Sequence, residues 1–214
     1  MTVVITGSNR GIGAALARRY SGTGETVLGT ARSGEGFLPL EVSDPASHAA
    51  LAKRLEGTVV DTLICNAGVY LDKGHGIGNG YGADLWAQTF AVNVTGVFLT
   101  IEALLPNLFL SAAPKIAIIS SQMASDTNAP GGSYIYRASK AAALNLGRNL
   151  AVDLKPKGIA VGIYHPGWVQ TDMGGAAADI TEDEAAAGLS ARFAALSLET
   201  TGCFETWDGR AHPF

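Results

Sequence analysis

A short apolar run that enters a glycine-rich turn and then a helical pattern is the feature that most constrains the fold of this chain. Residues 3–5 are β-branched, and an amphipathic helical pattern occupies residues 14–20. Gly7, Gly11 and Gly13 lie between them, spaced as Gly-x-x-x-Gly-x-Gly. We predict a buried strand, a tight turn and a helix whose first amide groups face an anion such as a pyrophosphate. This segment alone also fits an ordinary turn between a strand and a helix.

A tyrosine and a lysine further along the chain are spaced for shared chemistry. Tyr136 and Lys140 are four residues apart, so they share one face of a helix. A neighbouring ammonium group favours the phenolate, so we expect Lys140 to lower the pKa of Tyr136 towards neutral pH. Such a phenol can serve as a general acid or base, although the same spacing also occurs on solvated helix faces.

These two segments belong to a larger pattern that resembles the short-chain dehydrogenase/reductase family, in its small single-domain form. Several spaced motifs in the family's order are far more specific than any one of them. The matching segments are the cofactor turn from Thr6 to Gly13, the strand-end motif Asn66-Ala67-Gly68, the helix asparagine Asn93, the catalytic set Ser121, Tyr136 and Lys140, and the cofactor loop Pro166-Gly167. The segments 136–140, 165–175 and 208–213 are most similar to C-factor-like members, some of which are discussed as signalling proteins.

The resemblance assigns roles to individual residues. The catalytic residues that it implies are Asn93, Ser121, Tyr136 and Lys140. The positive charge of Arg32 makes it one expected cofactor contact. The others are Thr6, Gly7, Ser8, Asn9, Arg10, Gly11, Ile12, Gly13, Glu41, Val42, Asn66, Ala67, Gly68, Tyr136, Lys140, Pro166, Gly167, Val169 and Thr171. In similar enzymes the asparagine holds a water of a proton relay, and the lysine also binds the nicotinamide ribose. No metal is expected.

The resemblance implies an oxidoreductase that uses NAD(P)H. Hydride would pass between the nicotinamide and a carbonyl or alcohol carbon, while Tyr136 gives or takes the hydroxyl proton. The alternative is a binding or signalling protein that uses NAD(P) as a ligand, because a fold does not fix its function. The complete set of catalytic residues favours the enzyme, since a sensor does not require all four.

Two of the catalytic candidates can also be argued from their surroundings. Asn93 lies in a helical stretch, residues 83–110, that is apolar nearly all round, so its amide must be buried and needs hydrogen-bond partners. It is therefore either a structural residue with satisfied hydrogen bonds or part of a site.

Ser121 follows a predicted strand, and ligands of open α/β sheets bind outside the carboxyl ends of strands. Ser120 is the competing candidate. The link from Ser121 to Tyr136 is slightly longer than is usual, and the loop 125–133 can absorb the extra residues.

Charge at the end of the second predicted strand favours NADPH over NADH. An NAD enzyme places a carboxylate there for the ribose hydroxyls, and this chain has Ala31 and Arg32 instead. Arg32 and Arg10 could bind a 2′-phosphate through charge-assisted hydrogen bonds, although each could simply be solvated. We expect NADP, with NAD also possible. At the adenine, Glu41 replaces the aspartate that the family has, whereas Val42 matches the family. Val42 is therefore the better-supported contact with the adenine.

Composition bounds the class of protein. The 214 residues, 47% of them hydrophobic, predict one domain spanning residues 1–214. A net charge of −4 argues against nucleic-acid binding. With no leader pattern and no uninterrupted apolar run of about 20 residues, we expect no membrane association and a cytoplasmic location.

Cys65 and Cys203 are expected to be free and buried. The histidines His48, His75, His165 and His212 have no ligand spacing and are expected to be solvated or in loops, with His165 able to touch substrate.

Apolar runs alternate with helical patterns along the chain. The predicted strands are residues 3–6, 26–30, 37–41, 59–65, 116–120, 159–164 and 203–206, and the predicted helices are residues 12–21, 45–55, 83–110, 136–154 and 182–197. The strands are continuously apolar, as expected when helices cover both faces of a parallel sheet. We predict a doubly wound, Rossmann-like α/β fold in three layers.

The substrate and the assembly are less tightly constrained. The glycine-rich segment 70–82 could border the site or be a plain connector. The short stretch after Thr171 implies an open pocket, and Trp168, Met123 and Tyr134 would give it apolar walls, which suits an aldehyde, ketone or quinone. The small and apolar residues Ala138, Ala141, Ala142 and Leu146 are expected to lie exposed on a monomer. Such a patch predicts a homodimer or homotetramer.

Overall fold

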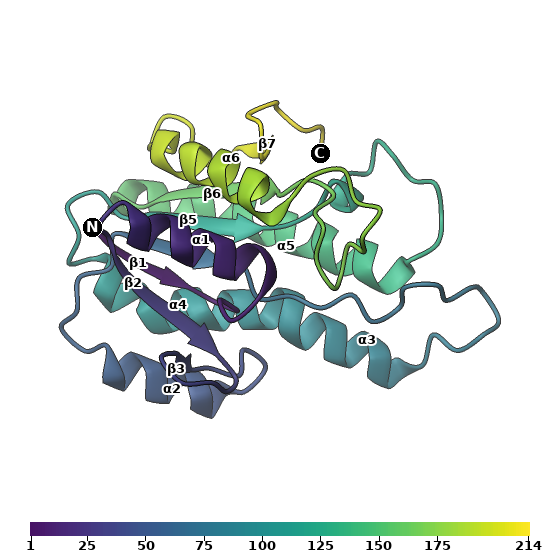
Figure 1. The fold of residues 1–214 in the computed structure, drawn as a ribbon, viewed down its shortest axis with the longest axis horizontal. Helices are drawn as coiled ribbons and strands as arrows, with labels where there is room; N and C mark the ends of the chain where they lie inside the picture. The colour runs from purple at the N-terminus through teal and green to yellow at the C-terminus, as the bar shows by residue number, and fades with distance from the viewer.

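Seven parallel strands form a single sheet in the computed structural model, which describes residues 1–214 (Figure 1). The strands are β1 (Thr2–Ile5), β2 (Thr26–Ala31), β3 (Leu38–Pro39), β4 (Thr62–Cys65), β5 (Lys115–Ile119), β6 (Ala160–His165) and β7 (Phe204–Thr206). Their order across the sheet is β3-β2-β1-β4-β5-β6-β7, and every neighbouring pair is parallel. The order reverses between β1 and β4, which is the topology of a doubly wound fold. The predicted α/β fold is confirmed.

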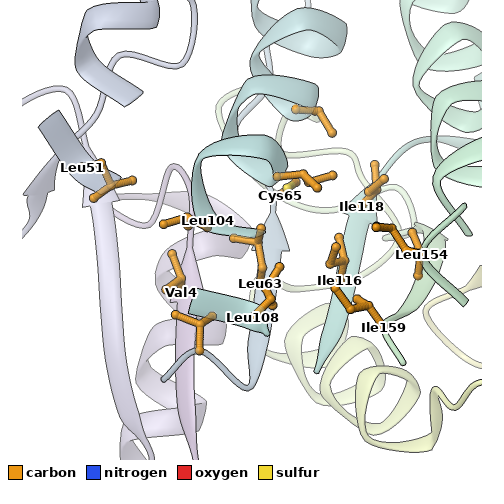
Figure 2. Close-up of a cluster of buried hydrophobic side chains, with 14 of the residues drawn as sticks. Val4, Leu51, Leu63, Cys65, Leu104, Leu108, Ile116, Ile118, Leu154 and Ile159 are labelled. Atoms are coloured by element: carbon orange, nitrogen blue, oxygen red, sulfur yellow. The ribbon is translucent and has the colours of Figure 1, made fainter. Parts of the chain in front are cut away.

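Helices cover both faces of the sheet, so the molecule has three layers. They are α1 (Gly11–Gly22), α2 (Pro45–Arg54), α3 (Ala83–Phe90), α4 (Gly96–Leu108), α5 (Tyr134–Leu154) and α6 (Glu182–Ala195). Side chains of α1 and α6 pack with Val3 and Ile5 on one face, and those of α2, α4 and α5 pack with Val4 on the other. Successive β1 side chains point to opposite faces, which explains its continuous apolar run. Figure 2 shows Val4, Leu63 and Ile116 in the second of these cores.

Two predicted strands are shorter in the structure. The expected strand 37–41 pairs with β2 only at Leu38–Pro39, because β2 ends at Ala31, whose carbonyl accepts from the Leu40 amide at 2.9 Å. The expected strand 59–65 begins at Thr62, since the Val60 amide instead donates to the carbonyl of Asn107 at the end of α4, at 3.2 Å. Both differences lie at element ends and leave the sheet order unchanged.

The single helix predicted over residues 83–110 contains a π-helical turn. Residues Ala91–Thr95 form this turn between α3 and α4. The extra residue in a π turn shifts the side chains that follow it, and such turns occur frequently at functional sites. Asn93 lies at the centre of the turn and is 1% exposed.

The helical run Ala83–Leu108 is long and apolar enough, by length and composition alone, to cross a membrane. In the fold, α4 packs on β4 and β5 and contributes Val97, Ile101, Leu104 and Leu108 to the core. A core helix of this kind passes the same test, so its composition is explained by burial against the sheet.

Two of the histidines are buried, contrary to the expectation from their sequence surroundings. On α2, the two ring nitrogens of His48 lie 3.0 Å from the carbonyl oxygen of Asp44 and 3.1 Å from Oγ1 of Thr100, which links α2 to α4. His165 is the last residue of β6 and is 8% exposed. The expectation of solvated or loop positions is therefore wrong for both.

Candidate active site

The sequence-predicted site residues gather at the edge of the sheet where the strands end. The loops after β4 and β5 extend from the same end of the molecule, on the right in Figure 1. The turn after β1 and the loop after β6 open at this edge as well, because all the strands are parallel. One sheet edge thus brings together segments that are distant in the sequence.

The glycine turn after β1 has the backbone that its sequence predicts. Gly7 and Gly11 have φ angles of +66° and +58°, in the region that favours glycine. A Cβ on Gly13 would lie 2.3 Å from the carbonyl oxygen of Gly7, so only glycine lets α1 approach the turn this closely. The Asn66 side-chain amide holds the turn from β4 by donating to the carbonyls of Thr6 and Gly7, at 2.9 and 3.1 Å.

The N-terminus of α1 is suited to an anion. The first helical hydrogen bond runs from the Ala14 amide to the Arg10 carbonyl at 3.2 Å, and the Arg10 side chain does not cap the helix. The amides of Gly11, Ile12 and Gly13 precede that bond, so they are free to bind an oxyanion. Ser8 is buried, and its hydroxyl donates to the Thr30 carbonyl at 3.2 Å. Asn9 is the exposed residue that follows it.

The loop after β6 lies beside this turn. A Cβ on Gly11 would be 3.6 Å from Cγ2 of Thr171, which places Thr171 next to the helix start. Val169 is buried and forms a bridge with Ile180, while Pro166 and Gly167 turn the chain out of β6. Gly167 has a φ of +91°. The expected cofactor residues of the first turn and of the late loop are therefore neighbours.

The end of β2 has a positive charge and no adjacent carboxylate. Ala31 is buried, Arg32 is exposed, and no acidic residue follows them directly. The guanidinium of Arg10 pairs with Asp172 at 2.9 Å, and both side chains are mostly exposed. An exposed pair of this kind contributes little, so it can yield to a phosphate. Glu41 accepts from the amide and hydroxyl of Ser43, which turns its carboxylate back on its own loop.

The contacts of Ser121 differ from those of Ser120. The Ser120 hydroxyl donates to the Lys140 carbonyl at 3.0 Å and is 2% exposed, so it ties β5 to α5. Ser121 begins the short 3₁₀ turn Gln122–Ala124, and its Oγ accepts from the Met123 amide at 3.1 Å. Burial raises the pKa of Tyr136, and of these two hydroxyls only that of Ser121 opposes this. The geometry thus favours Ser121 over Ser120.

Burial dominates the electrostatics of Tyr136 and Lys140. Burial raises the pKa of Tyr136 to about 12, a hydrogen bond with Ser121 opposes this, and the neighbouring Tyr70 and Asp72 add to it. Burial also lowers the pKa of Lys140 to about 8. The expectation that Lys140 lowers the pKa of Tyr136 is wrong here, because the loss of solvent outweighs an ammonium 5.7 Å from the ring centroid.

Lys140 and Asn93 lie together behind Tyr136. The Lys140 ammonium donates to the Ile119 carbonyl at 3.0 Å. The Asn93 Nδ2 donates to the carbonyl of Val69 and to the hydroxyl of Ser139, and its Oδ1 accepts from the Val69 amide, all within 3.0 Å. Its buried amide is therefore fully satisfied. A Cβ on Gly68 would lie 3.3 Å from Asn93 Oδ1 and 3.4 Å from Lys140 Nζ, so the Asn66-Ala67-Gly68 motif packs between them.

A cavity of about 340 Å³ lies beside this site. Gln122, directly after Ser121, lines it together with Trp168 and His165. No side chain of the protein partners the buried Nδ1 of His165. Of the three apolar walls expected from the sequence, only Trp168 lines this cavity, whereas Met123 is half-buried and Tyr134 is exposed.

Comparison with known proteins identifies the family. The family model described as short chain dehydrogenase matches residues 1–182. The chain belongs to the short-chain dehydrogenase family. It is 35% identical to 1-hydroxy-2-glutathionyl-2-methyl-3-butene dehydrogenase of Rhodococcus sp. (strain AD45), with 97% of each chain covered. It is 38% identical to the C-signal protein of Myxococcus xanthus, with 72% of this chain and 93% of that one covered.

A solved structure superposes along the whole chain. The NADPH-bound carbonyl reductase from chicken fatty liver has a TM-score of 0.90 and 29% sequence identity, and covers 100% of this chain and 98% of that one. The C-signal match agrees with the likeness to C-factor-like members, and the family match confirms the resemblance inferred from the motifs.

Two residues that sequence analysis missed lie against the candidate catalytic tyrosine of this dehydrogenase. The ring of Tyr70 stacks on that of Tyr136, with 4.2 Å between centroids. The carboxylate of Asp72 is fully buried at the start of α5. Both belong to the glycine-rich segment 70–82, which fitted a plain connector equally well. The only signal was an aromatic and an acidic residue directly after the Asn66-Ala67-Gly68 motif.

The surface expected to carry a subunit interface is less open than predicted. Ala138, Ala141, Ala142 and Leu146 are all half-buried, not exposed as expected. The cause is packing within the chain, since Leu146 contacts the core between the sheet and α5. Elsewhere on these helices, Phe98 of α4 and Val152 of α5 are exposed.

Proposed function

We propose that this short-chain dehydrogenase is an NADPH-dependent carbonyl reductase that acts on aldehydes, ketones or quinones. The observation that carries the proposal is the convergence of Ser121, Tyr136 and Lys140, all buried, beside a glycine turn with free amides. A phenol, a hydroxyl and an amine gathered at one edge of the sheet are the groups needed to move a proton to or from a substrate oxygen.

NADP fits the residues around the turn. The cradle left by Gly7, Gly11 and Gly13 admits a pyrophosphate close to the backbone, and the α1 amides can bind it. Arg10 and Arg32 would hold a 2′-phosphate, a choice that the missing acid after β2 supports. The NADPH in the related chicken carbonyl reductase supports the same cofactor. When bound, the cofactor supplies the hydride.

The chain's own residues would handle the proton. Ser121 and Tyr136 hydrogen-bond to the substrate oxygen and orient the carbonyl group. Because the pKa of Tyr136 is about 12, its phenol is protonated at neutral pH and is set to donate during reduction. Lys140, with a pKa of about 8, would hold the nicotinamide ribose by family resemblance, and Asn93 keeps Val69 and Ser139 in place behind it.

The cavity supports a carbonyl substrate with an apolar body. Trp168 and Trp207 offer aromatic walls, and Gln122, His165, Asp179 and Arg210 offer polar and charged groups. Two similar proteins support carbonyl and alcohol chemistry. One is a carbonyl reductase, and the other is a dehydrogenase whose name includes a hydroxylated compound. The raised pKa of Tyr136 keeps its phenol protonated, as the acid of the reduction step must be.

A signalling role is the second candidate, favoured by the 38% identity to the C-signal protein of Myxococcus xanthus. A protein of this kind would bind NAD(P) with little turnover. The two candidates differ in whether the hydroxyl of Tyr136 is needed, so kinetics separate them.

Replacement of the catalytic phenol tests the enzyme proposal. Tyr136→Phe should lower kcat for NADPH-dependent carbonyl reduction at least about 100-fold, because it removes the proton donor. The NADPH dissociation constant should change less than about twofold. The assay is NADPH oxidation against a panel of aldehydes, ketones and quinones. Tyr20→Phe, which removes a phenol on α1, is the control and should retain the native rate. Native turnover by Tyr136→Phe would exclude the assignment.

We also propose that the chain is one cytoplasmic domain that forms a homodimer or homotetramer through α4 and α5, without nucleic acid or membrane partners. Phe98 and Val152 leave apolar surface exposed on these helices. Light scattering at micromolar concentration should give at least twice the 22.0 kDa of one chain. Ala142→Glu should reduce the mass to that of a monomer. A native mass of one chain, or an Ala142→Glu variant that remains dimeric, would contradict this interface.

A further inference from the structure

The helix that carries Tyr136 begins without a cap of its own. Ser133 precedes α5 in the left-handed region, at φ +48°, and is the only residue other than glycine with a positive φ. Its side chain makes no capping hydrogen bond to the helix. The first amides of a helix need partners from elsewhere when they are buried, because an unpaired buried amide is costly. Both Ile135 and Tyr136 are buried.

Asp72 supplies the missing cap from a distant part of the chain. Its carboxylate accepts from the Ile135 amide at 2.8 Å and from the Tyr136 amide at 3.2 Å. Asp72 is 0% exposed and forms no ion pair, so these amides and the positive end of the helix dipole are what stabilise its charge. The residue reaches the helix across the sheet edge from the segment after β4.

Tyr70 holds the same helix start from the side. Its ring stacks on that of Tyr136 at an angle of 23° between the planes, and its hydroxyl hydrogen-bonds with the Ser133 hydroxyl. The segment Tyr70-Leu71-Asp72 therefore fixes the backbone before Tyr136, the backbone of Tyr136 itself and one face of its ring. A cap that only stabilised α5 would not require the contact with the ring.

We propose that Asp72 and Tyr70 are positioning residues, which set the orientation and the proton affinity of the Tyr136 phenol through the start of α5. This inference rests on the proposed function, in which that phenol transfers the proton. It assigns a role to the segment 70–82, where the sequence indicated only a border or a connector. The two residues act through Tyr136 and are not themselves proposed to contact the reacting atoms.

The charges around Tyr136 agree with this role. The titratable groups that face it are Tyr70 and Asp72 from the segment after β4 and Lys140 from α5, and the Ser121 hydroxyl faces it from the turn after β5. Burial is the main cause that raises the pKa of Tyr136, and the negative charge of Asp72 adds to it because it disfavours a second negative charge on the phenol. Reduction needs the protonated phenol, and the rate should therefore fall at high pH as Tyr136 ionises. Removing the charge of Asp72 should shift that fall to lower pH.

The test compares Asp72→Asn with Asp44→Asn. Asparagine keeps the size of the side chain and removes the charge. Asp44 caps α2 through the Ala46 amide at 2.9 Å, so Asp44→Asn controls for the loss of a carboxylate at a helix start. We expect Asp72→Asn to lower kcat about tenfold or more with KM changed less than about threefold, and to move the alkaline limb of the pH profile to lower pH. Asp44→Asn should leave all three unchanged.

A direct titration separates this proposal from the proposed function. The ¹³Cζ resonance of Tyr136, observed by NMR in protein with labelled tyrosine, should titrate at a lower pH in Asp72→Asn than in the native protein, whether or not the protein turns over substrate. An inactive native protein whose Tyr136 resonance shifts in this way would contradict the enzyme and support the positioning role. An unchanged titration with a native kcat would overturn the positioning role.

Tyr70 provides variants that do not depend on Asp72→Asn folding. Tyr70→Phe keeps the ring stack and removes the hydroxyl, whereas Tyr70→Leu removes both. We expect Tyr70→Leu to lower kcat more than Tyr70→Phe, with KM for the carbonyl substrate nearly constant. Equal, native kcat values for the two variants would overturn the role of the stacked ring, and a change confined to KM would assign Tyr70 to substrate binding instead.

Discussion

The two halves of the site are held in place by different means. The turn that faces the cofactor is fixed by its own glycines and by Asn66 on the neighbouring strand. The phenol that would face the substrate is fixed by Asp72 and Tyr70, more than 60 residues earlier in the chain. The first half depends on backbone shape, and the second depends on side chains from a loop.

This difference predicts which half of the site tolerates substitution. Backbone shape admits few substitutions, because the positions that need positive φ or a close approach accept only glycine. Side chains on a loop can be exchanged without disturbing the sheet, so the orientation and proton affinity of a catalytic group can be tuned there. Mutations in the first half should therefore abolish binding or folding, while those in the second should adjust rates.

The largest effect should come from filling the glycine cradle. In Gly13→Ala the new Cβ would lie 2.3 Å from the Gly7 carbonyl oxygen and 2.6 Å from Nδ2 of Asn66. The first atom belongs to the turn and the second to the side chain that holds it, so we expect a loss of about 3 kcal/mol or more in the free energy of unfolding and loss of NADPH binding. Urea unfolding and NADPH titration measure these quantities.

Gly22→Ala is the matched control in the same helix, because nothing lies within 4 Å of a Cβ there. Alanine should raise the free energy of unfolding by about 0.5–1 kcal/mol at a helical position. If Gly13→Ala were as stable as Gly22→Ala and still bound NADPH, the account of the turn as a backbone-limited cradle would be wrong.

A smaller effect should follow from removing the charges that select the cofactor. Arg10→Ala with Arg32→Ala should weaken NADPH binding about tenfold per arginine and leave NADH binding nearly unchanged, since only NADPH has the 2′-phosphate. Asp172→Asn should strengthen NADPH binding slightly, because it frees Arg10 from its ion pair. Arg18→Ala on α1, whose partner is Asp183, is the control. A native preference for NADH would refute the charge argument.

Local signals in the sequence predicted most of the fold. The apolar runs gave all seven strands, and the glycines marked the start of α1, because both effects depend on neighbouring residues. The length of β3 was overestimated because an apolar run does not reveal where the neighbouring strand ends, and β2 ends opposite Pro39. The π turn around Asn93 was missed because one extra residue within a helix leaves the apolar pattern almost unchanged.

The site was predictable only where it follows a known pattern. The motif residues converge at one sheet edge, as expected, since strand ends of a parallel sheet meet there. The caps and contacts of Asp72, Tyr70 and His48 were not predictable, because each partner is distant in the sequence. The sign of the shift in the pKa of Tyr136 was also mispredicted, since spacing reports the neighbouring charge but not the degree of burial.

The smallest predicted effect concerns the stability cost of Lys140. Burial lowers its pKa from 10.5 in the unfolded chain to about 8 in the folded protein. The unfolded chain then binds more protons between pH 8 and pH 10.5, so this residue makes the protein more stable as pH rises through that window. Tyr136 has the opposite effect, but mainly above pH 10, because its pKa is raised to about 12.

Comparison with Lys140→Met isolates this contribution between pH 8 and pH 9.5. Cys65 opposes it within the window, since burial raises the pKa of its thiol from 9.0 to about 12, and the difference between the two proteins removes that effect. The free energy of unfolding of the native protein should gain about 1–2 kcal/mol relative to Lys140→Met across the window. Urea unfolding at several pH values measures it. If the free energy of unfolding changed with pH in the same way in both proteins, Lys140 would remain charged in the folded protein. Its amine would then be a fixed positive charge of the site.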